Sequence, residues 1–251
     1  MPPTIRIIGI EGLPEIQAGD DLGALITEAA TRQKTPPESG DVLIVTQKIV
    51  SKAEGRILSL SQVNPSPLAV EIASEHDRDP RHTEVVLRET KRIVRMERGI
   101  IIAETRHGFR CANAGVDASN LANDDTVALL PLDSDASARK IRDHLQKALG
   151  VDVGIVISDT FGRPWREGAT NVAIGVAGLN PLQDYRGQTD TRGYPLRTTT
   201  IAVADELAAA AELAMGKLDR VPVALIKGYP YPKGNTGIQD LIRPPEHDLF
   251  R

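Results

Sequence analysis

The sequence predicts a mixed α+β fold, and three observations indicate it. Short apolar strands alternate with amphipathic helices in the centre of the chain, which is typical of α/β architectures. The N-terminal third and a hairpin near residue 107 interrupt that alternation. The 251 residues suit either one large domain or two intimately packed subdomains with an ample core. Because no clean linker divides the chain, we treat residues 1–251 as a single domain.

The N-terminal region contains two expected strands with a helix between them. Residues 4–10 alternate loosely between apolar and polar side chains, which predicts a strand. Asp20 and Asp21 then open an alanine-rich helix that runs to about Arg32, because acidic side chains favour the positive end of a helix. Residues 41–46 form a continuous apolar run, which indicates a second, buried strand.

Two further helices and a hairpin are expected next. Ser66 followed by Pro67 is a helix start, with Ser as the N-cap and Pro in the first turn. That helix should end before residues 79–80, and another should cover residues 83–90. Apolar runs on either side of His107 and Gly108 predict a β-hairpin over residues 100–112.

The second half of the chain has the clearest alternation. A strand is expected over residues 127–130, and Asp135 is expected to cap a helix that ends at Gly150. Residues 153–157 form a short β-branched apolar run that predicts a buried strand.

Beyond this central strand, residues 180–197 lack periodicity. A stretch of that length inside a compact protein usually serves binding or an interface. Asp205 then begins a helix to about Lys217, and residues 221–226 form a final strand.

Composition excludes several classes of protein. The formal charge of −4 provides no basic surface for nucleic acid or an anionic membrane. A single cysteine, Cys111, rules out a disulfide framework, and we interpret it as a packing residue. No apolar run approaches the roughly 20 residues needed to span a bilayer, and residues 1–6 lack a signal-peptide pattern. We expect a cytoplasmic protein without nucleic-acid or membrane partners.

Residues 158–168 carry an unusual density of reactive side chains directly after the central strand. Asp159 and Thr160 offer hard oxygen ligands of the kind that Mg²⁺ and Mn²⁺ prefer. Arg163 and Arg166 offer forked donors for phosphate or carboxylate. The alternative is a structural loop in which the aspartate caps a helix and pairs with an arginine.

Asp117 also follows an apolar strand, so it and Asp159 are expected to project from the same sheet edge. Two neighbouring carboxylates need a shared cation, or one must remain protonated. The alternative for Asp117 is an Asx turn that closes the hairpin. No P-loop or dinucleotide-binding signature is present. Lys52 could still support phosphate binding, although a solvated lysine on a strand edge is the more common case.

Three stretches resemble those of the coenzyme F420-0:gamma-glutamyl ligase family. They are residues 46–55 (TQKIVSKAEG), 115–120 (GVDASN) and 158–166 (SDTFGRPWR). The segments at 12–16, 214–217 and 241–244 fit the same family, so the resemblance covers essentially the whole chain.

The resemblance implies a GTP-dependent acid–amino-acid ligase that adds L-glutamate, gamma-linked after the first, to the deazaflavin precursor coenzyme F420-0. It also implies an intertwined homodimer, two divalent cations (Mg²⁺ or Mn²⁺) and K⁺. Position by position, it implies metal ligation by Asp117, Asp159 and Thr160. It further implies nucleotide contacts from Leu13, Pro14, Glu15, Ile16, Gln47, Lys52, Asn120, Glu212, Met215, Gly216 and Lys217.

Two features set this chain apart from some relatives. Gln47 stands where a small hydroxyl residue is expected in some of them, although an amide can also bond a phosphate or a base. Some relatives carry a second, flavin-binding domain, and since this sequence stops at Arg251 we expect that activity to be absent.

The implied chemistry agrees with the residues, because an amide forms from a carboxylate only after the oxygen becomes a leaving group. Phosphoryl transfer from GTP would give an acyl phosphate, which the glutamate amine attacks. Asp117 and Asp159 with bound cations, together with Arg163, Arg166 and Lys52, could neutralise the anionic groups. Two alternatives stay open: a metal-dependent phosphohydrolase and a non-catalytic nucleotide-binding protein.

Overall fold

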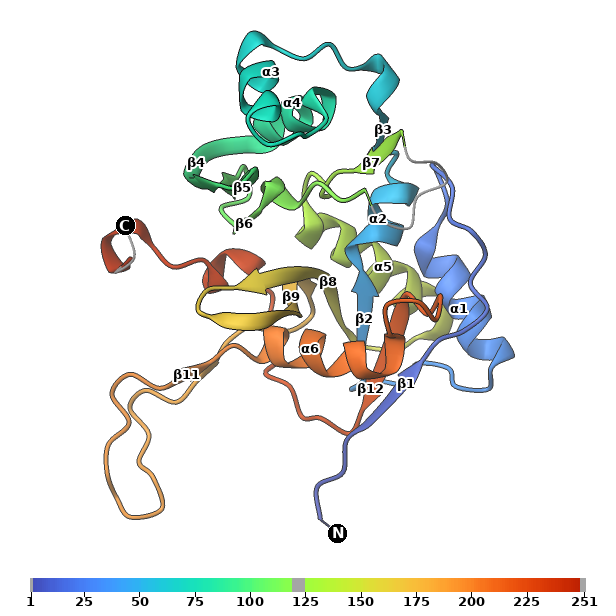
Figure 1. The fold of residues 1–251 in the computed structure, drawn as a ribbon. Helices are drawn as coiled ribbons and strands as arrows, with labels where there is room; N and C mark the ends of the chain where they lie inside the picture. The colour runs from blue at the N-terminus through green and yellow to red at the C-terminus, as the bar shows by residue number, and fades with distance from the viewer. Residues whose placement is uncertain (1, 119–124, 249–251) are drawn as a thin grey trace.

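A five-stranded mixed sheet forms the centre of the molecule (Figure 1). The computed structural model describes residues 2–118 and 125–248. The strand order is β1-β12-β2-β8-β9, in which β2 and β8 are parallel and the other neighbours antiparallel. The bounds are β1 Arg6–Gly9, β12 Val223–Lys227, β2 Val42–Thr46, β8 Gly154–Arg163 and β9 Arg166–Ala177.

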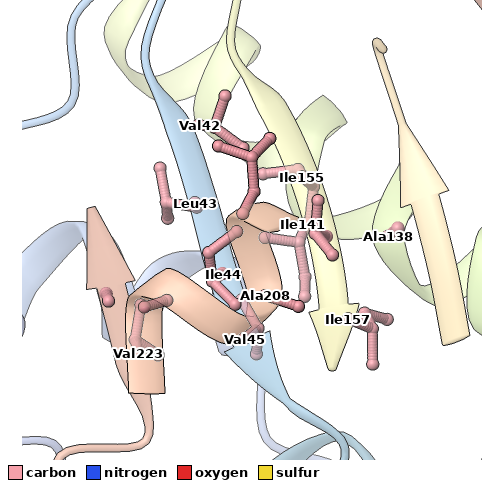
Figure 2. Packing of buried hydrophobic residues seen from close by; sticks show 14 of the residues in the cluster. Val42, Leu43, Ile44, Val45, Ala138, Ile141, Ile155, Ile157, Ala208 and Val223 are labelled. Atoms are coloured by element: carbon pink, nitrogen blue, oxygen red, sulfur yellow. The ribbon is translucent and has the colours of Figure 1, made fainter. Parts of the chain in front are cut away.

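Helices cover both faces of this sheet, which explains why its inner strands are apolar on both sides. Helices α1 (Leu22–Arg32) and α5 (Ser134–Leu149) pack on one face, and α6 (Val203–Met215) covers the other (Figure 1). Figure 2 shows Ile44 of β2 and Ile155 of β8 packed with Ile141 of α5 and Ala208 of α6. The expected strands and helices of this core are confirmed.

Two aspartates at the start of α5 have separate roles. The N-cap is Asp133, whose side chain accepts a 2.8 Å hydrogen bond from the Ala136 amide, so the prediction of Asp135 as the cap was wrong. Asp135 lies in the first turn, and its carboxylate accepts from the Val176 amide at 2.7 Å and from Ile238. Gly150 ends the helix in the left-handed conformation (φ 70°), as expected.

The outer edge of β9 is bonded by side chains from both helical layers. Asp205 of α6 accepts a 2.8 Å hydrogen bond from the Ala173 amide, as Asp135 of α5 does from Val176. Helix α6 itself begins at Val203, two residues before the expected start. The two carboxylates therefore fasten α5 and α6 to the same edge strand.

A smaller second part of the molecule has its own hydrophobic cluster. Its antiparallel sheet contains the expected hairpin, β5 and β6, and an additional strand, β4, that the sequence analysis missed. Ser66 caps α3 through the Ala69 amide, as expected. The bounds are β3 Ile57–Ser59, α3 Pro67–Ser74, α4 Pro80–Glu89, β4 Thr90–Glu97, β5 Ile100–Thr105, β6 Arg110–Ala112 and β7 Thr126–Ala128.

Residues 158–168, which were expected to follow the end of the central strand, form a β-hairpin that continues it. Strand β8 continues past Asp159 to Arg163, which pairs with Arg166 at the start of β9. Pro164 and Trp165 form the turn, where Trp165 has a φ of 58°. The apolar run that predicted the strand stops at Ile157, so the pattern gave no sign that the strand continues.

Short helices and an extended arm complete the fold. Helix α2 (Gln47–Ala53) follows β2 directly, and the sequence analysis had assigned no helix there. Residues 180–197 belong mostly to the long arm visible at the lower left of Figure 1, whose base is closed by β10 (Gln183–Asp184) and β11 (Thr200–Ile201). The 3-10 helices are η1 Leu60–Gln62, η2 Asn113–Gly115, η3 Ile238–Leu241 and η4 Pro245–His247. Among the described helices, none combines the length and apolar character that crossing a bilayer requires.

Candidate functional site

A cavity of about 220 Å³ lies where the central sheet meets the smaller part of the molecule. One wall comes from β8 and includes Asp159 and Thr160. The opposite wall comes from the β6–η2 segment and includes Asp117, and Lys217 enters from the end of α6. The full lining is Cys111, Ala112, Gly115, Val116, Asp117, Asp159, Thr160, Phe161, Gly162 and Lys217.

The two aspartates singled out in the sequence share this cavity, but they reach it from different sheets. Asp159 lies on β8 of the central sheet, whereas Asp117 makes an isolated antiparallel bridge with Ala128 of β7. The prediction of one common sheet edge was therefore wrong, while the predicted neighbourhood of the two carboxylates is correct. Each half of the molecule contributes one acidic group.

The cavity opposes the ionisation of Asp159. Burial, with the negative charge of Asp117 as a smaller contribution, raises the pKa of Asp159 to about 6. The Thr160 amide, which donates to Asp159 Oδ1 at 2.8 Å, and the charges of Lys217 and Lys48 act in the other direction. Lys48 Nζ also lies 2.8 Å from Asp117 Oδ2. For Asp159, the effect of burial thus outweighs the compensation that these protein groups provide.

Thr160 is held by a chain of hydrogen bonds that crosses the hairpin. Its hydroxyl donates to Asn171 Oδ1 at 2.8 Å, and Asn171 Nδ2 donates to Glu212 Oε2 at 2.8 Å. Lys217 Nζ donates to the same hydroxyl oxygen over 3.4 Å. Strands β8 and β9 and the helix α6 therefore all contribute to the position of this one side chain.

Arg163 and Arg166 lie at the exposed tip of the hairpin and do not line the cavity. The Arg163 guanidinium donates to the carbonyl oxygens of Glu167 (2.5 Å) and Gly168 (3.0 Å), which ties it to the start of β9. Trp165 between them is 83% exposed. The two arginines thus share a strand pair with Asp159 but face a different environment.

The expected nucleotide segment at residues 13–16 lies beside α2. Ile16 is buried, whereas the Glu15 carboxylate pairs with Lys52 Nζ at 2.5 Å. Lys52 follows Lys48 by four positions on α2, so the two lysines point from the same side of that helix. Helix α2 therefore connects the cavity with the segment around Glu15.

Other residues expected to contact nucleotide have different surroundings. The Gln47 side chain is buried and donates to Ser51 Oγ (2.5 Å) and the Leu129 carbonyl (3.2 Å), while Met215 is fully buried in the core. Gly216 has a φ of 62°, and a Cβ there would approach Asp219 Oδ2 to 2.0 Å. Asn120 lies outside the described residues.

Sequence reasoning missed two residues of this neighbourhood, Lys48 and Asn171. Lys48 carried a usable signal, since it lies one helical turn before Lys52. Asn171 carried none, because it meets Thr160 only through the β8–β9 register. Cys111 was interpreted as packing, and burial, reinforced by the nearby Asp159, raises the pKa of its thiol to about 12. A thiol that stays protonated is a poor nucleophile, which agrees with that interpretation.

Comparisons with known proteins give a consistent result over nearly the whole chain. The family model described as F420-0:Gamma-glutamyl ligase matches residues 10–228. The chain is 48% identical over 250 residues to the coenzyme F420:L-glutamate ligase of Methanothermobacter thermautotrophicus, covering 98% of this chain and 99% of that protein. It is 44% identical to the protein of the same description from Methanopyrus kandleri (99% and 98% covered). The corresponding protein of Methanocaldococcus jannaschii is 42% identical (98% and 97% covered).

Proposed function

The chain belongs to the F420-0:gamma-glutamyl ligase family, and from this premise we propose that it is a GTP-dependent ligase that adds L-glutamate to the deazaflavin precursor coenzyme F420-0. One observation supports the assignment of the site. Asp117 and Asp159 come from separate parts of the molecule and line one cavity with Thr160 and Lys217. Such an arrangement suits a reaction that gathers several anionic groups in one place.

The proposed reaction joins a carboxylate to an amine. The γ-phosphoryl group of GTP passes to the terminal carboxylate of the precursor, which yields an acyl phosphate and GDP. The amino group of glutamate then attacks the acyl carbon, the amide bond forms, and inorganic phosphate leaves with the oxygen. Triphosphate, carboxylates and the phosphoryl in transfer are all negative, so charge neutralisation and alignment are the main demands on the protein.

The residues at the cavity fit a divalent cation, which we propose to be Mg²⁺ or Mn²⁺. Asp117, Asp159 and Thr160 would hold it with hard oxygen donors, and a bound cation would relieve the repulsion that contributes to the raised pKa of Asp159. Within the described residues, no group of three His, Cys, Asp or Glu side chains gathers as a metal site. Water and substrate oxygens would therefore complete the coordination, as is usual for Mg²⁺.

When bound, the cation supplies electrostatic stabilisation of phosphate oxygens. The family resemblance supports extending the proposal to two divalent cations and K⁺ in each site.

The protein's own groups then have separate parts in the proposal. Lys217 and Lys48 place positive charge beside the carboxylates, while Lys52 and the segment around Glu15 face the nucleotide. Arg163 and Arg166, at the hairpin tip, bind carboxylate or phosphate groups of the substrates that extend out of the cavity. The reaction requires no nucleophilic side chain.

We also propose that the chain works as an intertwined homodimer in the cytoplasm, where GTP is available. Three large apolar side chains are almost fully exposed in the single chain: Leu213 (89%), Leu218 (84%) and Trp165 (83%). A second chain could cover these side chains, and the family resemblance supports a dimer. Light scattering coupled to gel filtration should give the mass of two chains, and the mass of one chain would contradict the dimer.

Mass spectrometry of the precursor after incubation with the protein, GTP, Mn²⁺ and L-glutamate tests the proposed reaction. We expect a product heavier by a glutamyl residue, with phosphate released from GTP chiefly when precursor and glutamate are both present. Phosphate release without glutamate would indicate a phosphohydrolase instead. Failure to bind Mn²⁺ and GTP together would indicate a non-catalytic protein.

A further inference from the structure

Asn171 is a buried polar residue directly opposite Thr160 in the β8–β9 hairpin. It is 3% exposed, and its amide group is used on both sides. Its Oδ1 accepts from the Thr160 hydroxyl, and its Nδ2 donates to Glu212 Oε2, each over 2.8 Å. The hairpin thus connects a group in the cavity with a carboxylate on α6.

The donor and the acceptor of each hydrogen bond in the series Thr160–Asn171–Glu212 follow from the chemistry of the Glu212 carboxylate. A carboxylate such as that of Glu212 only accepts hydrogen bonds, so the Asn171 amide must turn its NH₂ group towards α6. Its carbonyl oxygen then faces Thr160, and this oxygen can only accept. The Thr160 hydroxyl is therefore obliged to donate its single hydrogen away from the cavity.

A hydroxyl that donates in one direction keeps its oxygen lone pairs for the other. Lys217 Nζ, 3.4 Å from Thr160 Oγ1, approaches that acceptor side. The same lone pairs are the ones a cation or a donor in the cavity would use. If the oxygen and the NH₂ group of the Asn171 amide exchanged places, the Thr160 hydroxyl would have to accept from Asn171. The hydroxyl hydrogen of Thr160 would then be free to point at the cation.

We propose that Asn171 and Glu212 are positioning residues, which together orient the Thr160 hydroxyl so that its lone pairs face a divalent cation in the cavity. The proposal rests on the proposed function, since it assigns a use to the metal site of that reaction. It gives the Glu212 side chain a role different from the nucleotide contact that the family resemblance implies. It also explains why a buried amide, rather than an apolar residue, stands opposite Thr160.

Exchanging the donor and acceptor roles of the pair tests this orientation. Mn²⁺ binding to the full-length protein is measured by electron paramagnetic resonance of the free ion, in Glu212→Gln, Asn171→Asp and the double variant. In Glu212→Gln the amide of Asn171 can turn over, and in Asn171→Asp two carboxylates meet. Glu212→Gln should weaken Mn²⁺ binding by about 10-fold, which is the lower range for a partner of a metal ligand. Asn171→Asp alone keeps Thr160 as the donor, so it should not weaken Mn²⁺ binding.

The double variant has the same net charge and restores the bond directions. The introduced aspartate can only accept from Thr160, and the introduced glutamine can donate to that aspartate. We expect its Mn²⁺ affinity to return to within about threefold of the unmodified protein. A double variant that is folded but binds no better than Glu212→Gln would overturn the proposal.

A second cycle uses Thr160→Val as the background. Without the hydroxyl there is nothing to orient, so adding Glu212→Gln should leave Mn²⁺ affinity unchanged to within about twofold. A loss comparable to that in the unmodified background would show that Glu212 acts directly, and the proposal would fail. Thermal melting checks that each variant is folded. If Asn171→Asp does not fold, the cycle with Thr160→Val is sufficient by itself, because Glu212 is partly exposed and its replacement by Gln should be tolerated.

The proposed function and the positioning role of Asn171 and Glu212 can be contradicted separately. An unmodified protein that binds Mn²⁺ but adds no glutamate would contradict the proposed function and leave the binding cycles interpretable. An active protein whose Mn²⁺ affinity is unaffected by Glu212→Gln would contradict the positioning role alone.

Discussion

The base and the tip of the β8–β9 hairpin come from one short stretch of sequence, yet their surroundings differ completely. At the base, Asp159 lines the cavity and Thr160 bonds to the buried Asn171. At the tip, Arg163 donates hydrogen bonds to carbonyl groups at the start of β9, and Trp165 is exposed. The base therefore holds charged and polar groups in fixed positions, whereas the tip presents them to whatever approaches from solvent.

This difference indicates how a single motif can serve two purposes. Reacting groups need positions fixed by several elements, which the base receives from β9 and α6. A large acceptor needs contacts that extend beyond the reaction centre, and a projecting turn can supply them. Substitutions along the hairpin should accordingly have effects that decrease in size and change in kind from base to tip.

Asp159→Ala should have the largest effect, a loss of glutamate addition of about 10³-fold or more, since it removes an electrostatic partner from the reaction centre. Because the folded-state pKa of Asp159 is raised to about 6, its ionised form destabilises the protein above that pH. Stability from this group is present below its ordinary pKa of 3.8 and is lost as pH rises through about 6. Metal-free Asp159→Ala should hence melt at pH 8 no lower than the unmodified protein. Activity retained by the folded variant would remove Asp159 from the site.

Lys48→Gln should reduce activity by about 10- to 100-fold, as expected for a charged group that pairs with Asp117, a proposed metal ligand. Loss of this positive charge raises the pKa of Asp159 further, so the acidic limb of the pH–rate profile should move to higher pH. Rate measurements between pH 5 and pH 8 would show the shift, with Lys140→Gln on the far helix α5 as the matched control. A lower rate with an unmoved limb would mean that Lys48 acts without influencing Asp159.

Arg166→Ala tests the tip. If the tip binds anionic substrate groups, KM for the precursor should rise by about 10-fold while kcat changes little, because the contact is the same before and during reaction. Steady-state kinetics with varied precursor would separate the two constants. A fall in kcat with unchanged KM would place Arg166 at the reaction centre, and the contrast between base and tip would then be lost.

Trp165→Gly should have the smallest effect, and it should be on stability. Trp165 occupies the left-handed region at φ 58°, which costs a residue with a side chain about 1–2 kcal/mol. Glycine relieves that cost, so the free energy of unfolding should rise by about 1 kcal/mol in urea titrations. A decrease would show that contacts of the indole ring outweigh the backbone strain.

The sequence predicted those parts of the fold that depend on local pattern. The buried strands β2 and β8 follow from apolar runs. The N-cap role of Ser66, and the start of a helix at Asp20 and Asp21, follow from helix-start chemistry. The neighbourhood of Asp117 and Asp159 was also predicted, although by the wrong route. These features need only a few consecutive residues to be recognised.

The remaining features depend on partners that are distant in sequence. Nearly all residues of strand β4 are exposed, so the strand has no alternation of buried and exposed residues that could predict its pairing with β5. Asn171 acquires its meaning only when the hairpin register places it across from Thr160. Asp135 looks like a cap in sequence, but it accepts hydrogen bonds from Val176 and Ile238. Long-range pairing, not residue chemistry, was the missing information.

The carboxylates of Asp135 and Asp205 also affect the tendency of the protein to aggregate. Each one occupies an outward amide of β9, the last strand of the central sheet. An exposed strand with free amides invites a foreign strand to extend the sheet, which is a common beginning of aggregation. Here an incoming strand would have to displace two acidic side chains at that border, and their negative charge makes the border a poor template for growth.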